Sequence, residues 1–144
     1  MEAHPVSFVN DPYVIGRNDR MISISGFLEA GLDGEVNSEA IREVQYSAPG
    51  GQLDFVRGAQ LSKGGKSILA AYSTAKDGAV SRIVPKIEGP ATDPRSDVQY
   101  IVTEFGVANL AGKSIAQRVE EMIAIAHPKF RTELTEQAKA LGYI

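Results

Sequence analysis

Residues 98–126 read VQYIVTEFGVANLAGKSIAQRVEEMIAIA and hold the two signals that decide the fold. The stretch opens with the apolar run VQYIVT at positions 98–103, which follows an aspartate and predicts a largely buried β-strand. It continues into residues 114–126, where apolar side chains recur at steps of four, three and four and predict an amphipathic helix. These side chains are Ile115, Val119, Met122 and Ala126. A buried strand followed by such a helix is typical of an α/β domain.

Further elements extend the pattern on both sides of this stretch. Pro128 begins a second helix that ends at Gly142, in keeping with proline at helix starts and glycine just past helix ends. Most of the 14 glycines lie before residue 79, which indicates a loop-rich front half that contains strands. The turn Leu32-Asp33-Gly34 predicts a β-hairpin that returns into Glu35-Val36. The other expected elements are a short helix after Asp11-Pro12, a helix over residues 52–61, and strands over residues 21–25, 66–72 and 80–84.

Length and composition limit the class of protein. The chain has 144 residues and 15.4 kDa, which predicts a single domain over residues 1–144. Its formal charge of −3 gives no basic surface for nucleic acid, and its apolar runs are too short to cross a membrane. The sequence contains no cysteine, so disulfides, thiolate metal sites and a cysteine nucleophile are excluded. The absence of cysteine and of a visible secretory signal fits a cytoplasmic protein.

Several familiar motifs are incomplete. Two Gly-Lys-Ser triplets begin at Gly65 and Gly112, but a phosphate-binding P-loop also needs a glycine five positions earlier. Gln60 and Val107 occupy those positions, so the second triplet is better explained as the start of a helix at Ser114. The two histidines lack partners at metal-ligand spacing, so no metal site is expected, and no Gly-x-Ser-x-Gly nucleophile motif is present.

Two features of the sequence each have a functional and a structural explanation. Glu104 ends an apolar strand, and strand ends of α/β sheets often bind ligands, although residues in such positions more often have a structural role at the strand terminus. Three glycine-containing stretches could direct backbone amides at an anion or an oxyanion, or could simply be turns. They are Pro49-Gly50-Gly51, Lys63-Gly64-Gly65 and Lys76-Asp77-Gly78.

An ordered series of longer stretches resembles the C-terminal region of the acetyl-CoA hydrolase/transferase family, which includes acetate, succinate and 4-hydroxybutyrate CoA-transferases. The resemblance runs in the family's order from about Asn10 to the C-terminus. The matching stretches are NDPYVIGRNDRMISI, DGEVNSEAI, GGQLDFVRGAQLSKGGKSILA, STAKDGAVSRIVP and RSDVQYIVTEFGVANLAGKSIAQRVEEMIAIAHPKFR. The resemblance implies a three-layer α/β domain with a mainly parallel central sheet flanked by helices, plus the N-terminal β-hairpin.

The resemblance also implies a reaction. Enzymes of this family have two similar α/β domains and move CoA between carboxylic acids. A glutamate carboxylate attacks the acyl-CoA thioester, giving an acyl anhydride and then a glutamyl-CoA thioester, which is covalent catalysis. The family places that glutamate upstream of the region matched here, in an N-terminal half that this chain lacks. The glutamates that do not match its motif are Glu29, Glu35, Glu39, Glu43 and Glu104.

Seven residues match family positions that line the active site opposite the glutamate. Gly78 matches the glycine whose backbone amide helps hold the tetrahedral oxyanion, although the geometry of a turn would also explain a glycine at this position. Asn37 matches a polar residue of the pocket for CoA and the glutamate, although a simple turn role fits as well. The others are the diglycine loop near the thioester end of CoA and two residues beside the oxyanion loop: Gly50, Gly51, Gln52, Thr74 and Lys76.

The resemblance has limits and alternatives. Ser25-Gly26 and Ala30-Gly31-Leu32 depart from the usual family pattern, which affects the shape of the neighbouring pocket. The expected substrates are an acyl-CoA and a small carboxylate, with coenzyme A as the carried group and no metal. The expected partners are the N-terminal domain of the same enzyme and further copies in a homo-oligomer. The alternatives are a noncatalytic module of the same fold that binds CoA or a nucleotide, and a subunit-contact domain.

Overall fold

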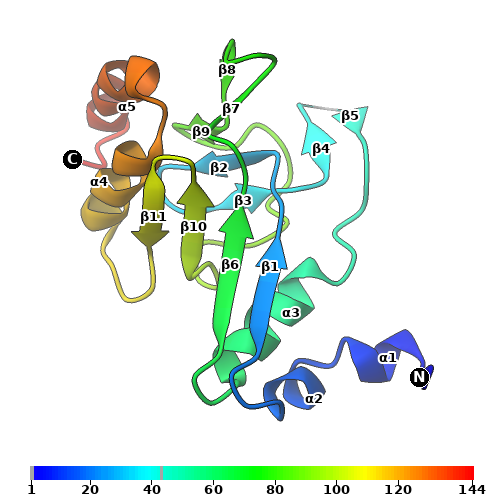
Figure 1. The fold of residues 1–144 in the computed structure, drawn as a ribbon. Coiled ribbons are helices and arrows are strands. Elements are labelled where there is room, and N and C mark those ends of the chain that lie inside the picture. Colours follow the sequence, from blue (N-terminus) through cyan, green and yellow to red (C-terminus); the bar gives the residue numbers. More distant parts are fainter. Residues whose placement is uncertain (1, 43) are drawn as a thin grey trace.

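The structure is a computed structural model that describes residues 2–42 and 44–144. Its central sheet has four strands in the order β1 (Ile22–Ser25), β6 (Lys66–Ala70), β10 (Tyr100–Thr103) and β11 (Gly106–Asn109) (Figure 1). The first three strands are parallel, and β11 runs antiparallel to β10. The mixed α/β class and the mainly parallel central sheet are therefore confirmed.

One face of this sheet is covered by two helices, α3 (Gln52–Leu61) and α4 (Ile115–Ile125). Ile101 is paired with Leu69 on β6 and with Ala108 on β11, so these three side chains point to the same face. All three are buried, and they form one apolar cluster with Val56 of α3 and Met122 of α4. Both helices therefore lie on the same side of the sheet.

The opposite face carries six apolar side chains, here called the open face. Ile24, Val107 and Ile22 on the two outer strands are 68%, 59% and 45% exposed. The side chains of the inner strands are only half-buried. The six residues are Ile22, Ile24, Ile68, Ala70, Val102 and Val107, and the register places Lys66, Tyr100 and Asn109 on the same face. The described residues thus supply the sheet and one helical layer of the three expected layers.

The helix boundaries follow the local signals closely. Asp11 accepts a hydrogen bond from the amide of Tyr13 and caps α2 (Pro12–Gly16), as expected. The two C-terminal helices, α4 and α5 (Pro128–Ala140), are confirmed, and the Ser114 side chain caps α4. A further short helix, α1 (Val6–Val9), has no buried residue and was not predicted.

The predicted hairpin is present. It consists of β2 (Glu29–Gly31) and β3 (Val36–Asn37), which are antiparallel, and Gly34 in its turn has a φ of +94°. That backbone conformation suits glycine, because it brings a Cβ into steric conflict. A second short hairpin, β4 (Ala40–Ile41) with β5 (Val44–Gln45), follows and was not predicted.

The prediction of one buried strand over residues 80–84 is wrong. β8 (Val80–Ser81) pairs with β7 (Thr74–Ala75), whereas β9 (Ile83–Val84) pairs with β2 in another sheet. Arg82 separates them, because its Nη1 donates to the carbonyls of Phe27 and Leu28 at 3.2 and 2.9 Å. Val80 is 47% exposed, so only the second half of the run is buried.

Candidate functional site

The residues predicted for the site all lie on segments at one edge of the central sheet. Parallel strands end at a common edge, and ligands of open α/β sheets bind there. Figure 1 shows β4, β5, β7 and β8 beyond the ends to which the arrows of β1 and β6 point. The hairpin that follows β1 carries Asn37, the N-terminus of α3 carries the diglycine loop, and the segment after β6 carries Thr74, Lys76 and Gly78. We call this edge the carboxyl edge.

The segment that leaves β1, residues 26–28, joins these parts. The Ser38 hydroxyl donates to the Gly26 carbonyl at 3.2 Å, and the Leu28 amide donates to the Asn37 carbonyl at 2.9 Å. Arg82 binds the same segment from the other side, and its own amide donates to the Ser73 carbonyl at 2.8 Å. The hairpin and the strands after β6 are therefore held on one short piece of backbone.

The loop that carries Gly78 has an unusual conformation. Lys76, Asp77 and Gly78 have φ values of +52°, +52° and +83°, so three successive residues are left-handed. Two of them have side chains, and each such residue costs roughly 1–2 kcal/mol. The turn is closed by a hydrogen bond of 3.0 Å from the Ala79 amide to the Lys76 carbonyl. The ammonium of Lys129, at the start of α5, donates to the Gly78 carbonyl.

The amide of Gly78 is available for a ligand. Among the described residues it donates no hydrogen bond. A Cβ built at Gly78 would have no heavy atom within 4 Å, so the glycine faces open space. Gly78 is half-buried and its neighbours Asp77 and Ala79 are exposed, so this N–H can bond to water or to an incoming acceptor.

Glu104 anchors the strand that leads into this loop. Its carboxylate accepts hydrogen bonds from the Ser73 amide and the Ser73 hydroxyl, both at 2.7 Å. Desolvation opposes ionisation, but these hydrogen bonds outweigh it and lower the pKa of Glu104, with a smaller contribution from His127. The structure therefore favours the structural alternative for Glu104, as an ionised anchor for β7.

The diglycine loop is fixed through Gln52. Gly50 has a φ of +56°, which favours glycine, and a Cβ at Gly51 would lie 2.1 Å from Asn10 Nδ2, so a larger residue at Gly51 would displace the Asn10 side chain. The Gln52 side-chain amide donates to Ser38 Oγ at 2.7 Å and to Asp93 Oδ2 at 2.5 Å. Gln52 thus connects the start of α3 to the residue next to Asn37.

Asp93 and Ser38 were not identified from the sequence. Asp93 is fully buried, one of its carboxylate oxygens has no partner among the described residues, and burial raises its pKa despite the hydrogen bond from Gln52. The only local signal was Asp93-Pro94, a dipeptide typical of turns. Only the fold brings its carboxylate to Gln52.

Asn37 is buried and fully hydrogen-bonded within the protein. Its Nδ2 donates to Glu29 Oε1 at 2.9 Å and to the Ala40 carbonyl at 2.7 Å. Its Oδ1 accepts from the amides of Glu39 and Ala40, both at 3.1 Å. The side chain therefore fixes the turn after β3, and a role toward a ligand stays a prediction.

The predicted residues thus form two connected groups. One group is Asn37 with Gly50, Gly51 and Gln52, linked through Ser38, and the other is Thr74, Lys76 and Gly78, with residues 26–28 between them. Of the five glutamates considered, Glu43 lies outside the described residues. One oxygen of the Glu29 carboxylate, Oε1, accepts from the amides of Glu88 and Gly89, at 2.9 and 3.1 Å, as well as from Asn37, and so takes part in structural contacts.

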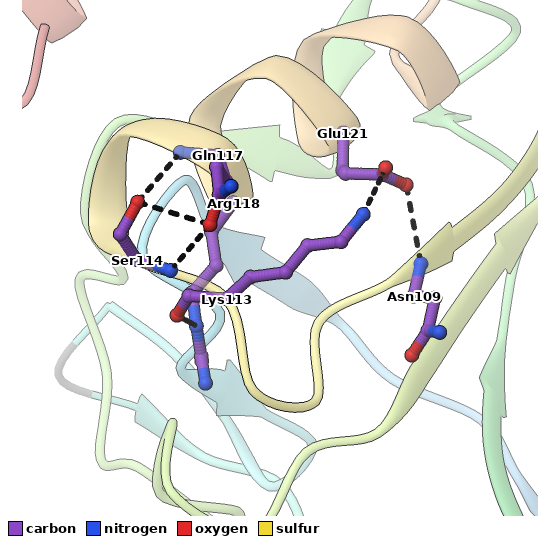
Figure 2. A network of polar contacts seen from close by, with 6 residues as sticks. All are labelled: Asn109, Lys113, Ser114, Gln117, Arg118 and Glu121. Carbon is purple, nitrogen blue, oxygen red and sulfur yellow. Dashed lines mark hydrogen bonds and ion pairs between the residues drawn. The ribbon is translucent and has the colours of Figure 1, made fainter.

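The second Gly-Lys-Ser triplet is a helix start, as the sequence indicated (Figure 2). The Ser114 hydroxyl accepts from the Gln117 amide, and the Gln117 side chain accepts from the Ser114 amide, which is a capping box. Lys113 pairs with Glu121 on the same helix, and this hydrogen bond lowers the pKa of Glu121. The lysine is engaged with a carboxylate and is not presented to a phosphate.

Within residues 2–42 and 44–144, every helix is too short or too polar to cross a lipid bilayer. The same ranges contain no group of three His, Asp or Glu side chains arranged to hold a metal ion.

Fold and site together define an α/β domain with glycine loops at the carboxyl edge of a mainly parallel sheet, one of which carries a backbone amide without a partner among the described residues. The family model for the acetyl-CoA hydrolase/transferase C-terminal domain matches residues 1–138. The chain belongs to this family, as the sequence resemblance indicated.

Several relatives have been named as CoA transferases. The succinyl-CoA:cyclohexane-1-carboxylate CoA transferase of Geobacter metallireducens is 50% identical over 146 residues, which cover 100% of this chain and 33% of that protein. The 4-hydroxybutyrate coenzyme A transferase of Clostridium kluyveri is 50% identical over 141 residues, which cover 96% of this chain and 33% of that protein. The chain therefore spans about a third of the length of these relatives.

Solved structures agree with this assignment. RipA from Yersinia pestis matches with a TM-score of 0.93 and 56% identity over 97% of this chain and 32% of its own. The 4-hydroxybutyrate CoA-transferase from Porphyromonas gingivalis matches with a TM-score of 0.78 and 46% identity, again over 97% of this chain and 32% of its own. The expected architecture of a CoA-transferase C-terminal domain is confirmed.

Proposed function

We propose that this chain is the C-terminal part of a CoA-transferase or acyl-CoA hydrolase. The enzyme would move CoA between acyl-CoA thioesters and carboxylates such as acetate or 4-hydroxybutyrate, through a glutamyl-CoA intermediate whose glutamate lies outside these 144 residues. The observation that carries the proposal is the amide of Gly78, which has no partner among the described residues and faces open space. Family membership and the names of the relatives support the same reaction.

In this proposal Gly78 stabilises charge that develops during the reaction. When a carboxylate attacks the thioester carbonyl, the carbonyl oxygen becomes an oxyanion, and the Gly78 N–H donates to it. One well-placed donor lowers such a barrier by about 3 kcal/mol. Thr74 and Lys76 flank the loop, while the contact from Lys129 to the Gly78 carbonyl holds the peptide in place.

The diglycine loop would receive the thioester end of CoA. Gly50 and Gly51 allow close approach to the backbone, and Gln52 is held by Ser38 and Asp93. Asn37 does not contact CoA in this proposal but fixes the turn next to Ser38, and Ser38 in turn holds Gln52. Coenzyme A is thus a substrate carried by the enzyme, and no step of the proposed reaction requires a metal.

The proposed partners and cellular location are those of the complete CoA-transferase. The attacking glutamate would come from the N-terminal domain of the same enzyme, and the complete enzyme would form a homo-oligomer. A cytoplasmic location is consistent with the complete absence of cysteine.

The test compares Gly78→Ala with Gly112→Ala. Both glycines have positive φ, +83° and +70°, and neither has a heavy atom within 4 Å of an added Cβ, so the backbone penalty is matched. The chain is fused behind the first two thirds of the Geobacter relative, and CoA transfer from acetyl-CoA, succinyl-CoA and 4-hydroxybutyryl-CoA is measured. Gly78→Ala keeps the backbone N–H but places a methyl group in the open space beside it, where it obstructs the approach of the thioester carbonyl, and is expected to lower kcat about 100-fold. Gly112→Ala is expected to lower kcat less than about 3-fold.

Two results would contradict the proposal. Equal losses for the two variants would show that backbone strain, and not the oxyanion contact, explains the effect. Robust turnover by the 144-residue chain alone would place the nucleophile inside it.

A further inference from the structure

The side-chain amide of Gln52 lies between two groups that can only accept hydrogen bonds. Asp93 Oδ2 lies 2.5 Å from Gln52 Nε2, and a carboxylate has no hydrogen to donate. Ser38 Oγ lies 2.7 Å from the same nitrogen, and the one hydrogen of this hydroxyl is donated to the Gly26 carbonyl at 3.2 Å. A reversed amide would place Gln52 Oε1 against both acceptors. The two acceptors therefore fix which way the amide faces.

The two acceptors are themselves fixed by the backbone. Asp93 is fully buried and exchanges two backbone hydrogen bonds of 3.0 Å with Val36 on β3. The Ser38 amide donates to Thr92 Oγ1 at 2.9 Å, so Ser38 is held by the residue that precedes Asp93. Because Asp93 is buried, it cannot reach a ligand, and any effect that it has on one passes through Gln52.

Only the carbonyl oxygen of Gln52 is left for a ligand. Both hydrogens of Nε2 are used, and no described residue donates to Oε1. The side chain is half-buried and lines a groove of about 600 Å³ together with Gly51 and Phe55. An acceptor attracts an N–H or O–H group and repels the oxygens of phosphates and carboxylates. The ligand group that meets Gln52 is therefore a hydrogen-bond donor.

We propose that Asp93 is a positioning residue, which orients the Gln52 amide so that its carbonyl oxygen accepts a hydrogen bond from the pantetheine arm of CoA. The donor is the N–H of the amide nearest the sulfur, since the diglycine loop receives the thioester end of CoA. The phosphates of CoA are directed away from this point by the same acceptor. The inference rests on the proposed function, because it assumes that CoA occupies the groove.

The experiment exchanges the two partners in the fused enzyme of the Gly78 test and measures KM and kcat for succinyl-CoA. Gln52→Glu alone sets two carboxylates against each other and is expected to raise KM at least about 10-fold. In the double variant Gln52→Glu/Asp93→Asn, the amide at position 93 donates to one oxygen of the new carboxylate, and the other oxygen faces the groove. Its KM is expected to return to within about 3-fold of the parent, with kcat within about 3-fold in both variants.

This rescue separates accepting from donating, because an ionised glutamate has no hydrogen to donate. A double variant as impaired as Gln52→Glu would show that the ligand needs the amide hydrogens of Gln52, and an unchanged KM for Gln52→Glu would show that the orientation has no effect. Either result would overturn the proposal. Asp33→Asn is the control, since Asp33 is 4% exposed and contacts Glu35 and Arg95 instead; its KM is expected to change less than about 2-fold.

A second measurement changes the substrate. In an analogue of succinyl-CoA, an ester oxygen replaces the N–H nearest the sulfur, and the KM of the parent is expected to rise at least about 10-fold. Gln52→Leu removes the acceptor and is expected to bring the KM values of the two substrates within about 2-fold of each other. Equal KM values for the two substrates in the parent would overturn the proposal.

The outcome is separable from that of the proposed function. Transfer by the fused parent without these changes in KM would refute this inference and leave the proposed function intact. No transfer by the fused parent would refute the proposed function, and urea unfolding of the 144-residue chain would still test the orientation of Gln52. There Gln52→Glu is expected to lower the midpoint, and the addition of Asp93→Asn to restore most of it. Losses that simply add would overturn the positioning role of Asp93.

Discussion

Asn37→Asp is the sharpest test of the network beneath the carboxyl edge. The change is nearly isosteric, and Oδ1 can still accept from the amides of Glu39 and Ala40. The NH₂ group is replaced by an oxygen that faces two acceptors, Glu29 Oε1 at 2.9 Å and the Ala40 carbonyl at 2.7 Å. No space is available for the side chain to turn away, because a Cβ at Gly89 would lie 2.3 Å from Nδ2.

The magnitude follows from the two lost hydrogen bonds. The Ala40 carbonyl is a buried acceptor that loses this donor, which costs about 1–3 kcal/mol, whereas Glu29 Oε1 keeps the amides of Glu88 and Gly89. The new carboxylate also faces that of Glu29 in a buried position, which adds repulsion. We expect the free energy of unfolding to fall by about 3–5 kcal/mol, a large part of the roughly 5–15 kcal/mol typical of a domain.

Urea unfolding followed by circular dichroism measures this loss. With a denaturant slope of about 2 kcal/mol/M, the midpoint should fall by about 2 M. Asn109→Asp is the control, since it adds the same charge on an exposed strand. A midpoint within about 0.5 M of the parent would show that the amide of Asn37 does not make these contacts.

Three further changes test other parts of the molecule. Gly58→Ala places a Cβ 2.5 Å from Ile15 Cβ and Cγ2, and this overpacking should cost about 1–3 kcal/mol, more than the gain of about 1 kcal/mol in helix propensity. Proteolysis of residues 2–21 should therefore become faster. Unchanged stability in urea would contradict the contact between α2 and α3. Ser114→Ala removes the capping box of α4 and should lower the free energy of unfolding by about 1 kcal/mol, measured by urea unfolding; no loss would show that the cap is not formed. Asp93→Asn removes a carboxyl whose pKa is raised by burial in the folded state. Between the pKa of Asp93 in the unfolded chain and its higher pKa in the folded chain, the folded parent binds more protons than the unfolded parent, so the stability of the parent falls as pH rises. The stability of the variant relative to the parent should therefore rise from pH 4 to pH 7, as measured by thermal unfolding. A difference in stability that does not change with pH would refute the burial of this carboxyl.

Elements defined by local signals were predictable. The helix α4 has both an apolar stripe and a capping serine, and α5 begins at Pro128 and is followed by Gly142, so their boundaries needed no knowledge of the rest of the fold. The turn at Gly34 was equally local. The strands β1, β6 and β10 were recognisable because short apolar runs between polar or glycine residues seldom form anything else.

Elements defined by distant partners were not predictable. Residues 80–84 look like one strand, but their two halves pair with β7 and β2, and only the contact of Arg82 with residues 27–28 reveals the break. The open face was hidden for the same reason. A strand buried on both faces and one buried on a single face can carry the same apolar residues, and only exposure in the structure distinguishes them.

The candidate site residues were predicted mainly from the family resemblance, and the structure adds how the backbone around them is held. Lys76 and Asp77 give no sign in the sequence of a left-handed backbone, because φ values above zero are uncommon for residues other than glycine. The link from Gln52 to Asp93 spans 41 positions and is likewise invisible to local pattern. Both features concern how the backbone is held, which depends on tertiary contacts.

The left-handed loop and the open face differ in their contacts within this domain. Two non-glycine residues at positive φ cost roughly 1–2 kcal/mol each, and this cost persists only where surrounding contacts impose it. Here the pairing of β7 with β8, the anchor from Ser73 to Glu104 and the contact of Lys129 with Gly78 all act on one loop. Their combined effect is to hold the peptide of Gly78 in a fixed position at the carboxyl edge. Among the described residues the open face has no comparable polar framework, so the strained loop and the apolar face are separate features of the domain.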